Sequence, residues 1–149
     1  MKSFVAIGLA ALILAAPAVA AEPAITEPSA KDETQIDSLI DAVLTGLKQN
    51  KIKPAANAFF MTNPIMRGKT SEMDYFGVGA EGTIGIYGTI SDCQLIEKVN
   101  RGKWAQSRLY VCQHERFLTR WIFDVIKSST GWQSANLRYD DKFSLSITQ

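Results

Sequence analysis

The spacing of apolar residues changes once along this chain of 149 residues, and that change constrains the fold more than any other feature. From residue 31 to about residue 50 the apolar side chains recur three or four positions apart, which is typical of one buried face of an α-helix. These side chains are Ile36, Leu39, Ile40, Val43, Leu44 and Leu47. After Gly82 the chain is rich in β-branched and aromatic residues broken by turn signals, which indicates strands. The sequence therefore predicts an α+β fold.

Proline and capping residues mark the ends of the predicted elements. Ser29 and Asp32 have the spacing of a capping box ahead of the long helix. Pro54 suits the first turn of a short second helix that ends before Pro64, and a further helical turn is expected over 70–75. Strands are expected over 83–98, 104–115, 118–127 and 132–140. Both helices should pack on a curved antiparallel sheet of about four strands.

Residues 1–20 have the pattern of a cleavable signal peptide. Lys2 precedes an apolar run that the small residues Ala18 and Ala20 follow, so cleavage is expected after Ala20 or one residue later. The alternative is an uncleaved membrane anchor, but the apolar run is shorter than the ~20 residues that a spanning helix needs. We therefore expect a periplasmic or secreted protein with no stable membrane insertion after cleavage.

The expected mature chain carries no net charge. Cleavage removes Lys2, one of the 16 basic residues, and leaves 15 basic and 15 acidic residues. A neutral surface has no long-range attraction for nucleic acid or anionic lipid, so neither is expected as a partner. Residues 21–30 contain two prolines and no periodicity, which predicts a disordered leader. Residues 31–149 are expected to form a single domain.

Cys93 and Cys112 are the two cysteines of the chain, an even number in a protein predicted to be exported. If Gly102 and Lys103 form a two-residue turn, the two cysteines face one another on neighbouring strands. The same register opposes Leu95 to Tyr110, Ile96 to Leu109 and Glu97 to Arg108. The sequence thus predicts a cross-strand disulfide. Two buried free thiols are the alternative.

The last hairpin is predicted to turn through a loop that ends in a left-handed Gly131. The register that follows gives the hairpin one mostly apolar face, which supports it. The predicted pairs are Thr119 with Tyr139, Trp121 with Leu137 and Phe123 with Ala135. Ile122 and Ile126 give the third strand a second apolar face, so this strand is expected to be covered on both sides or to meet a second subunit.

Residues 77–82 match the G-x-G-x-x-G pattern of dinucleotide sites. Such a site needs a strand before the glycines and a helix after them. Here a strand is predicted to begin at Thr83, so no nucleotide or other cofactor is expected. The glycines are interpreted as a flexible lead-in to the sheet, and Gly85 and Gly88 as bulges or points of close helix packing.

The sole histidine, His114, is predicted to lie in solvent at the end of a strand. A general base or a metal ligand needs convergent partners, and the nearby Asp92 is expected on the opposite face of the hairpin. Asp140 and Asp141 are interpreted as a solvated strand exit. No serine lies in a nucleophile elbow, and no metal site is expected.

Short segments along the expected strands give the chain a family resemblance. They are Tyr87-Gly88, Leu95-Ile96, Arg108-Leu109-Tyr110, Trp121-Ile122-Phe123, Gly131-Trp132 and Tyr139-Asp140-Asp141. Together with the order of the elements, they make residues 35–142 resemble small exported bacterial proteins of the nuclear-transport-factor-two-like superfamily. The resemblance implies an α+β cone, in which a curved sheet wraps a long helix and leaves a cavity at the wide end. Its members include isomerases and dehydratases with an Asp or an Asp/His pair in that cavity, and non-catalytic binding or dimerising domains.

No position of this chain matches an enzyme motif of that superfamily, so a non-catalytic binding role is favoured. We expect a small apolar ligand, or a protein partner such as a second copy of the chain, to bind at the cone mouth or on the sheet face. The candidate surface consists of Tyr110, Trp121, Phe123 and Tyr139. The alternative is an isomerase or dehydratase that uses one buried group, Asp92, Asp124 or His114. The layout alone also admits an inhibitor of the cystatin type.

Overall fold

The computed structural model describes residues 27–143, so the predicted signal peptide over 1–20 lies outside the described residues. Within this range, helices precede a sheet. The helices are α1 (Ala30–Lys48), α2 (Ile52–Phe60) and α3 (Thr70–Tyr87), with a 3-10 turn η1 (Pro64–Gly68) before α3. The strands are β1 (Ile90–Arg101), β2 (Ala105–His114), β3 (Leu118–Ser128) and β4 (Gly131–Asp140). No helix among residues 27–143 has both the length and the hydrophobicity that crossing a bilayer requires.

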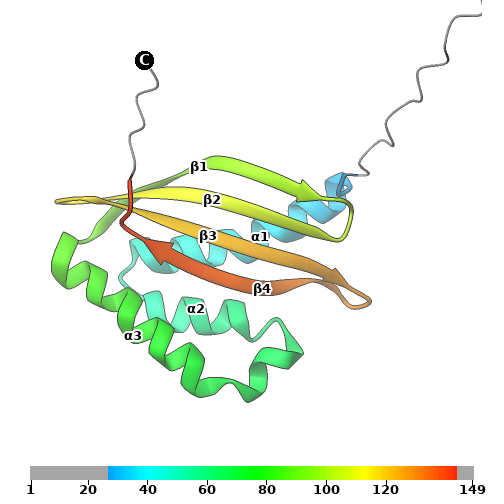
Figure 1. Cartoon of the computed structure of the whole chain (residues 1–149), viewed down its shortest axis with the longest axis horizontal. Helices are drawn as coiled ribbons and strands as arrows, with labels where there is room; N and C mark the ends of the chain where they lie inside the picture. The colour runs from blue at the N-terminus through cyan, green and yellow to red at the C-terminus, as the bar shows by residue number, and fades with distance from the viewer. Residues whose placement is uncertain (1–26, 144–149) are drawn as a thin grey trace, which may run out of the picture.

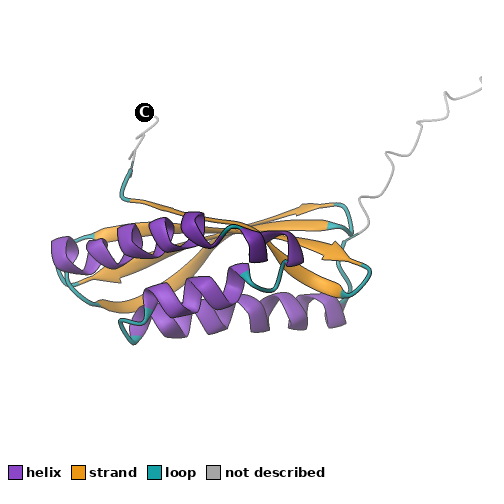
Figure 2. Ribbon diagram, turned by 90° about the horizontal axis from the view of Figure 1, so that it is seen from below, coloured by secondary structure: helices purple, strands orange, loops and turns teal. Residues whose placement is uncertain are grey.

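The four strands form one curved antiparallel sheet in the order β1-β2-β3-β4 (Figure 1). Helices α1 and α2 pack on one face of this sheet, and α3 lies beside it along the edge strand β4 (Figure 2). Figure 1 looks onto the opposite face, which none of these three helices covers. The predicted α+β class is therefore confirmed, with one more long helix than the sequence indicated.

The amphipathic pattern of the first helix is confirmed as the centre of the core. Ser29 and Asp32 form the predicted capping box, in which the Asp32 carboxylate accepts a hydrogen bond from the Ser29 backbone N–H at 3.0 Å. Ile36, Ile40 and Leu47 from the predicted stripe are fully buried. Burial of this stripe on the sheet supplies the main apolar contact that holds α1 in place.

The sheet side of the core contains three of the four residues predicted to form a ligand or partner surface. Trp121 and Phe123 are fully buried and Tyr110 nearly so. The ring of Phe123 meets Phe59 and Tyr110 edge to face, with ring centroids 5.8 and 5.6 Å apart. The prediction of an exposed surface at these residues is wrong, because α1 and α2 pack directly on this face and exclude solvent from it.

Helix α3 corrects the largest error of the sequence interpretation. Residues predicted as one helical turn, a flexible glycine lead-in and the start of a strand form one continuous helix, and β1 begins only at Ile90. Gly77 allows α3 to approach α2 closely, because a Cβ there would lie 2.6 Å from the Lys53 side chain. Met73 and Ala80 are buried in the core. This packing outweighs the low helix propensity of the glycines.

The first hairpin confirms the predicted cysteine pairing and corrects the turn. Cys93 faces Cys112 and the two form a disulfide, with their Cα atoms 4.0 Å apart. The turn has three residues between Arg101 and Ala105 rather than two, and a bulge after Leu95 takes up the difference. Consequently Leu95 faces Tyr110 as predicted, whereas Arg108 faces Lys98 and not Glu97.

The last hairpin is shifted from its predicted register without a change of face. A two-residue turn joins Ser128 to Gly131, and a bulge follows at Asp124. Trp121 therefore faces Tyr139 instead of Leu137, and Phe123 faces Leu137 instead of Ala135. A shift of two residues keeps each side chain on its own face, so the predicted apolar face survives.

A buried arginine attaches the first half of α1 to the sheet. Arg108 on β2 is only 3% exposed, and its guanidinium donates to Glu33 at 2.7 Å and to Asp37 at 2.5 Å. Its Nε donates to Gln106, whose amide donates in turn to Glu33. Hydrogen bonds therefore meet the polar groups that this contact buries, as a buried charge requires.

Candidate ligand-binding site between α3 and β4

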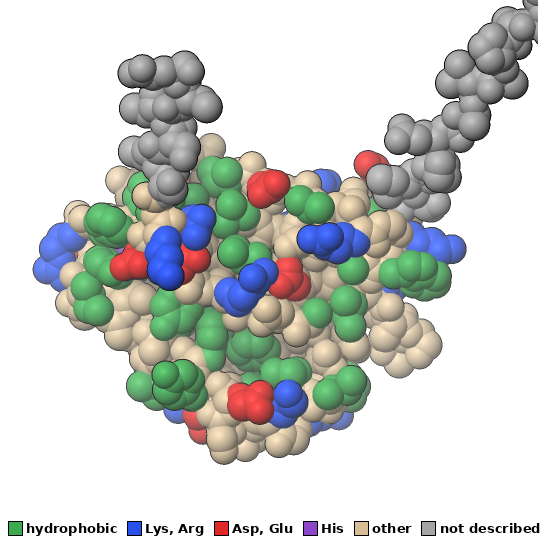
Figure 3. Space-filling model, in the orientation of Figure 1, with side chains coloured by type: hydrophobic (Ala, Val, Ile, Leu, Met, Phe, Trp, Pro, Cys, Tyr) green, Lys and Arg blue, Asp and Glu red, His purple; other side chains and the backbone are tan. Residues whose placement is uncertain are grey.

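Two adjoining cavities lie between α3 and the end of β4, and Gly79 and Tyr139 line both of them. The apolar cavity, of about 460 Å³, is lined in addition by Tyr75, Phe76, Val78, Leu137 and Arg138. The polar cavity, of about 390 Å³, is lined in addition by Gly82, Thr83, Ile86, Tyr87, Thr119, Asp140 and Asp141. We call the two together the α3–β4 groove. In Figure 3 hydrophobic side chains gather along this strip, beside the charged side chains of the strands.

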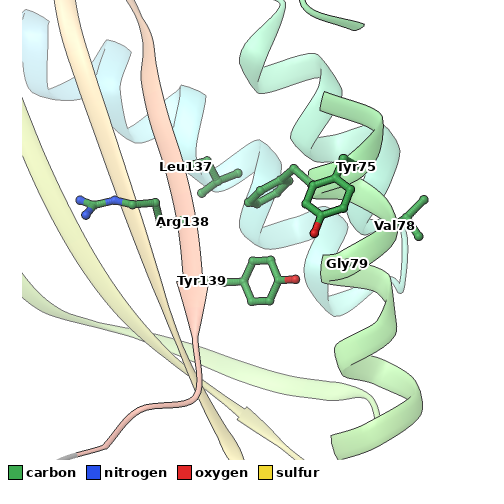
Figure 4. Close-up of a pocket in the computed structure, with 7 residues that line it drawn as sticks. Tyr75, Val78, Gly79, Leu137, Arg138 and Tyr139 are labelled. Carbon is green, nitrogen blue, oxygen red and sulfur yellow. The ribbon is translucent and has the colours of Figure 1, made fainter. Parts of the chain in front are cut away.

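Tyr139 separates the two cavities. Its ring stacks on Trp121 with centroids 5.1 Å apart and meets Phe76 edge to face at 5.4 Å. Its hydroxyl points at α3 (Figure 4), so closely that a Cβ on Gly79 would lie 2.8 Å from the oxygen. Burial raises the pKa of Tyr139. A glycine is thus needed at position 79 for this ring to reach across the groove.

No charged side chain that lines the apolar cavity points into it. Figure 4 shows Leu137 and Tyr139 turned towards α3, whereas Arg138 points the other way. The Arg138 guanidinium is instead paired with Asp124 at 3.1 Å. Tyr75 on the opposite wall is 86% exposed, which is unusual for an aromatic side chain beside a concave surface.

Carboxylates and hydroxyls line the polar cavity. The hydroxyl of Tyr87 donates to Asp141, and this hydrogen bond raises the pKa of Tyr87. Asp140 accepts from Arg120 at 2.7 and 2.9 Å, which lowers the pKa of Asp140. The two aspartates lie at the end of β4 as predicted, Asp141 exposed and Asp140 partly buried, and both also line this cavity.

Gly82 leaves open space on the α3 wall of the polar cavity, beside Thr83, Ile86 and Tyr87. Apart from adjacent residues and the helix's own backbone, no atom lies within 4 Å of the position that a Cβ would take on Gly82, and the same is true of Gly85. Gly82 lines the polar cavity and Gly85 lines neither cavity. Unlike Gly77 and Gly79, these two glycines are not required by any close approach between elements of the described chain.

His114 is buried, which corrects the prediction that it lies in solvent. It is 3% exposed; Nδ1 lies 2.7 Å from the Gly88 carbonyl and Nε2 lies 2.9 Å from Thr119 Oγ1. Because a carbonyl only accepts, Nδ1 carries a hydrogen and donates it to Gly88, while Nε2 shares a hydrogen bond with the Thr119 hydroxyl. Trp121 Nε1 donates to the same Thr119 oxygen at 2.9 Å. The chain from α3 to β1 folds over the strand end and encloses the histidine.

The three predicted acid–base candidates do not converge. Asp92 lies on β1 with an exposed side chain paired with Lys48 at 3.3 Å. Asp124 accepts hydrogen bonds from Ser107 and Arg138. His114 uses both ring nitrogens within the protein. Among residues 27–143 no three metal-ligating side chains are grouped as a metal site would require.

Sequence reasoning missed the α3 wall of this groove. Of the four residues of the candidate surface, Tyr139 lines the groove, whereas Tyr110, Trp121 and Phe123 line neither of its two cavities. A signal was present, because Tyr75, Gly79, Gly82 and Ile86 recur at helical spacing. The glycines masked that signal, since a helix with four glycines is disfavoured by propensity.

Comparisons with known proteins support the fold. No protein-family model matches the chain, and no curated protein matches it. The structure is similar to the crystal structure of a domain of unknown function with a cystatin-like fold from Nostoc punctiforme. The TM-score is 0.54, with 11% sequence identity, over 78% of this chain and 81% of that chain. The cystatin-like fold is related to the α+β cone that the sequence resemblance implied, so the likeness supports the architecture and carries no function with it.

Proposed function

We propose that the protein is an exported, non-catalytic binding protein that holds a small, largely apolar ligand in the α3–β4 groove. The observation that carries this proposal is the pair of adjoining cavities on either side of Tyr139. Each has a volume within the range of roughly 300–1,000 Å³ that is common for small-molecule sites.

The side chains around the groove support this function. Tyr75, Val78 and Ile86 on α3 are each more than half exposed, although all three are large and apolar. Exposed apolar side chains that gather at one concave place are characteristic of ligand and partner sites. A ligand in the groove would remove these side chains from water, which is favourable in proportion to the apolar area that it covers.

The alternative of an isomerase or dehydratase has less support. Such an enzyme needs an acid or base inside the ligand cavity, within hydrogen-bonding reach of the substrate. Asp92, Asp124 and His114 line neither cavity. The two carboxylates that do line the polar cavity, Asp140 and Asp141, already accept hydrogen bonds from Arg120 and Tyr87. We therefore propose a binding protein rather than an enzyme.

A pair of glycine variants tests the groove as the binding site. Gly82→Phe places a ring inside the polar cavity, and Gly85→Phe places the same ring on the same helix outside both cavities. Binding is measured by titration with N-phenyl-1-naphthylamine, an uncharged dye whose fluorescence rises in apolar surroundings. We expect saturable binding to the native protein, at least tenfold weaker binding to Gly82→Phe, and native binding to Gly85→Phe. Equal affinities in the two variants, or no saturable binding to the native protein, would refute the proposed site.

The export part of the proposal has a separate test. The full chain is expressed in a Gram-negative host, and the protein in the periplasmic fraction is analysed by N-terminal sequencing. We expect the mature chain to begin immediately after Ala20 or Ala21. A full-length protein that stays in the cytoplasm or the membrane fraction would contradict export.

A further inference from the structure

The two cavities of the α3–β4 groove differ in chemistry. Beyond the shared Gly79 and Tyr139, the apolar cavity is lined mostly by aromatic and aliphatic side chains. The polar cavity adds Thr83, Tyr87, Thr119 and two aspartates. A ligand that spans the groove would therefore meet apolar surface at one end and oxygen acceptors at the other.

No basic side chain that lines the groove points into it. Arg138 is the one basic residue that lines either cavity, and its side chain points away to Asp124. Arg120 lies nearby, and two of its three guanidinium nitrogens, Nε and Nη2, donate to Asp140. Arg116 donates to the carbonyl of Gly85. A further cation is Lys142, which follows Asp141 in the chain and whose charge helps to lower the pKa of Asp140. An anionic group in the groove would therefore meet no cation among the residues that line it.

Asp141 is the carboxylate best placed for a ligand. One of its oxygens accepts from Tyr87, and no basic side chain is paired with it among the ion pairs of residues 27–143. The aromatic rings of Tyr87 and Tyr139 line the same cavity. One face of the Tyr87 ring stacks on Phe117, and one face of the Tyr139 ring stacks on Trp121. The other face of such a ring can attract an organic cation, and a carboxylate beside it adds a charge of the correct sign.

We infer that the ligand of the α3–β4 groove is an amphipathic organic cation, with its ammonium group beside Asp141 and its apolar part beside Tyr75, Phe76 and Leu137. This inference rests on the function proposed above. It assigns the polar cavity to the charged head and the apolar cavity to the body of the ligand.

Three probes with the same eight-carbon chain separate the charge preference from apolar binding. They are octylamine, 1-octanol and octanoate, each tested at pH 7 and low ionic strength by displacement of the uncharged dye. We expect octylamine to bind about fivefold more tightly than octanol, because an exposed ion pair and a cation–π contact each contribute only modestly. Octanoate should bind most weakly. The preference for octylamine should shrink at 0.5 M salt.

Two variants that each remove one carboxylate test whether Asp141 causes the preference for octylamine over octanol. Asp141→Asn should bring octylamine to the affinity of octanol and leave octanol unchanged. Asp92→Asn removes the same charge from β1, at the opposite edge of the sheet from β4, and should keep the native preference. If octanoate binds as tightly as octylamine, or if the preference survives in Asp141→Asn, the inference is overturned while the proposed groove stands. If none of the three probes displaces the dye, the proposed function itself fails.

Discussion

The two ends of the helical layer are built differently. Where α1 crosses the sheet, the apolar side chains are buried, and the polar groups beneath Arg108 are paired by hydrogen bonds. Where α3 runs beside β4, the large apolar side chains Tyr75 and Ile86 stay exposed and cavities remain. Helix α3 packs mainly on α2, and it meets the sheet through side chains such as Phe76 on Tyr139. The contact between α1 and the sheet stabilises the fold, whereas the α3–β4 groove leaves space for a ligand. Substitutions in the first region should therefore change the free energy of unfolding, and substitutions in the second should change ligand binding.

The largest expected difference in stability is between removing an aromatic ring from the core and removing one from the groove. Phe123→Ala deletes a fully buried side chain and should reduce the free energy of unfolding by about 3–5 kcal/mol. Tyr75→Ala deletes an exposed side chain and should change it by less than about 0.5 kcal/mol. Urea unfolding followed by tryptophan fluorescence measures both. Comparable losses would show that the groove wall is part of the core.

The disulfide should stabilise the sheet without affecting the groove. It joins β1 to β2, and replacing both Cys93 and Cys112 by alanine should reduce the free energy of unfolding by about 3 kcal/mol for a loop of this length. Dye binding in the groove should be unchanged, because β1 and β2 lie away from β4. A loss of dye affinity in a folded double variant would mean that the two regions are coupled. Reduction of the native protein should add the mass of two hydrogens.

A smaller effect is the loss of stability at low pH that follows from protonation of Asp32. The Asp32 carboxylate accepts from Lys127 at 2.7 Å and from Trp132 at 2.8 Å, and these bonds, with that from Ser29, hold the pKa of Asp32 well below its usual range. The unfolded chain binds this proton near pH 4 and the folded chain only at lower pH. The stability due to ionised Asp32 is therefore complete above about pH 4 and is lost as the pH falls further.

Asp32→Asn should remove that part of the pH dependence. The variant should be less stable than the native protein at pH 7, and the difference should narrow between pH 4 and pH 2, as measured by thermal unfolding across that range. Parallel curves for the two proteins would show that the charge of Asp32 does not stabilise the start of α1.

The smallest expected effects compare glycines within α3. Gly82→Ala and Gly85→Ala should each stabilise the protein by about 0.5–1 kcal/mol, since alanine favours a helix and nothing lies near either new methyl group. Gly79→Ala should destabilise it instead, because the methyl group would meet the Tyr139 hydroxyl. Thermal unfolding of the three variants ranks them. A stabilising Gly79→Ala would mean that Tyr139 is free to move out of the groove.

The difference between the α1 contact and the α3–β4 groove also explains which parts of the structure could be predicted from the sequence. The apolar spacing of Ile36 and Ile40 predicted α1, and the cysteines predicted the register of the first hairpin, because both patterns are local or pairwise. Helix α3 depends on packing against α2 that offsets its glycines, and propensity pointed the other way. The groove could not be predicted without α3, and the burial of His114 depends on the same segment.

The position of α3 has a further consequence, which concerns how the two edges of the sheet are protected. An edge strand offers unpaired backbone groups to any other extended chain, and natural sheets guard against such aggregation. At β1, pairing with a further strand is disfavoured by the bulge after Leu95 and by the exposed charged side chains of Glu97 and Lys98. At β4, side chains bind backbone groups that a further strand would otherwise bind. Asn63 donates to the Ser134 carbonyl at 2.7 Å, and Thr62 accepts from the Ser134 N–H at 2.9 Å. Further along β4 the free edge of the strand faces α3 (Figure 1), so a molecule seated between them would also hinder the addition of another strand.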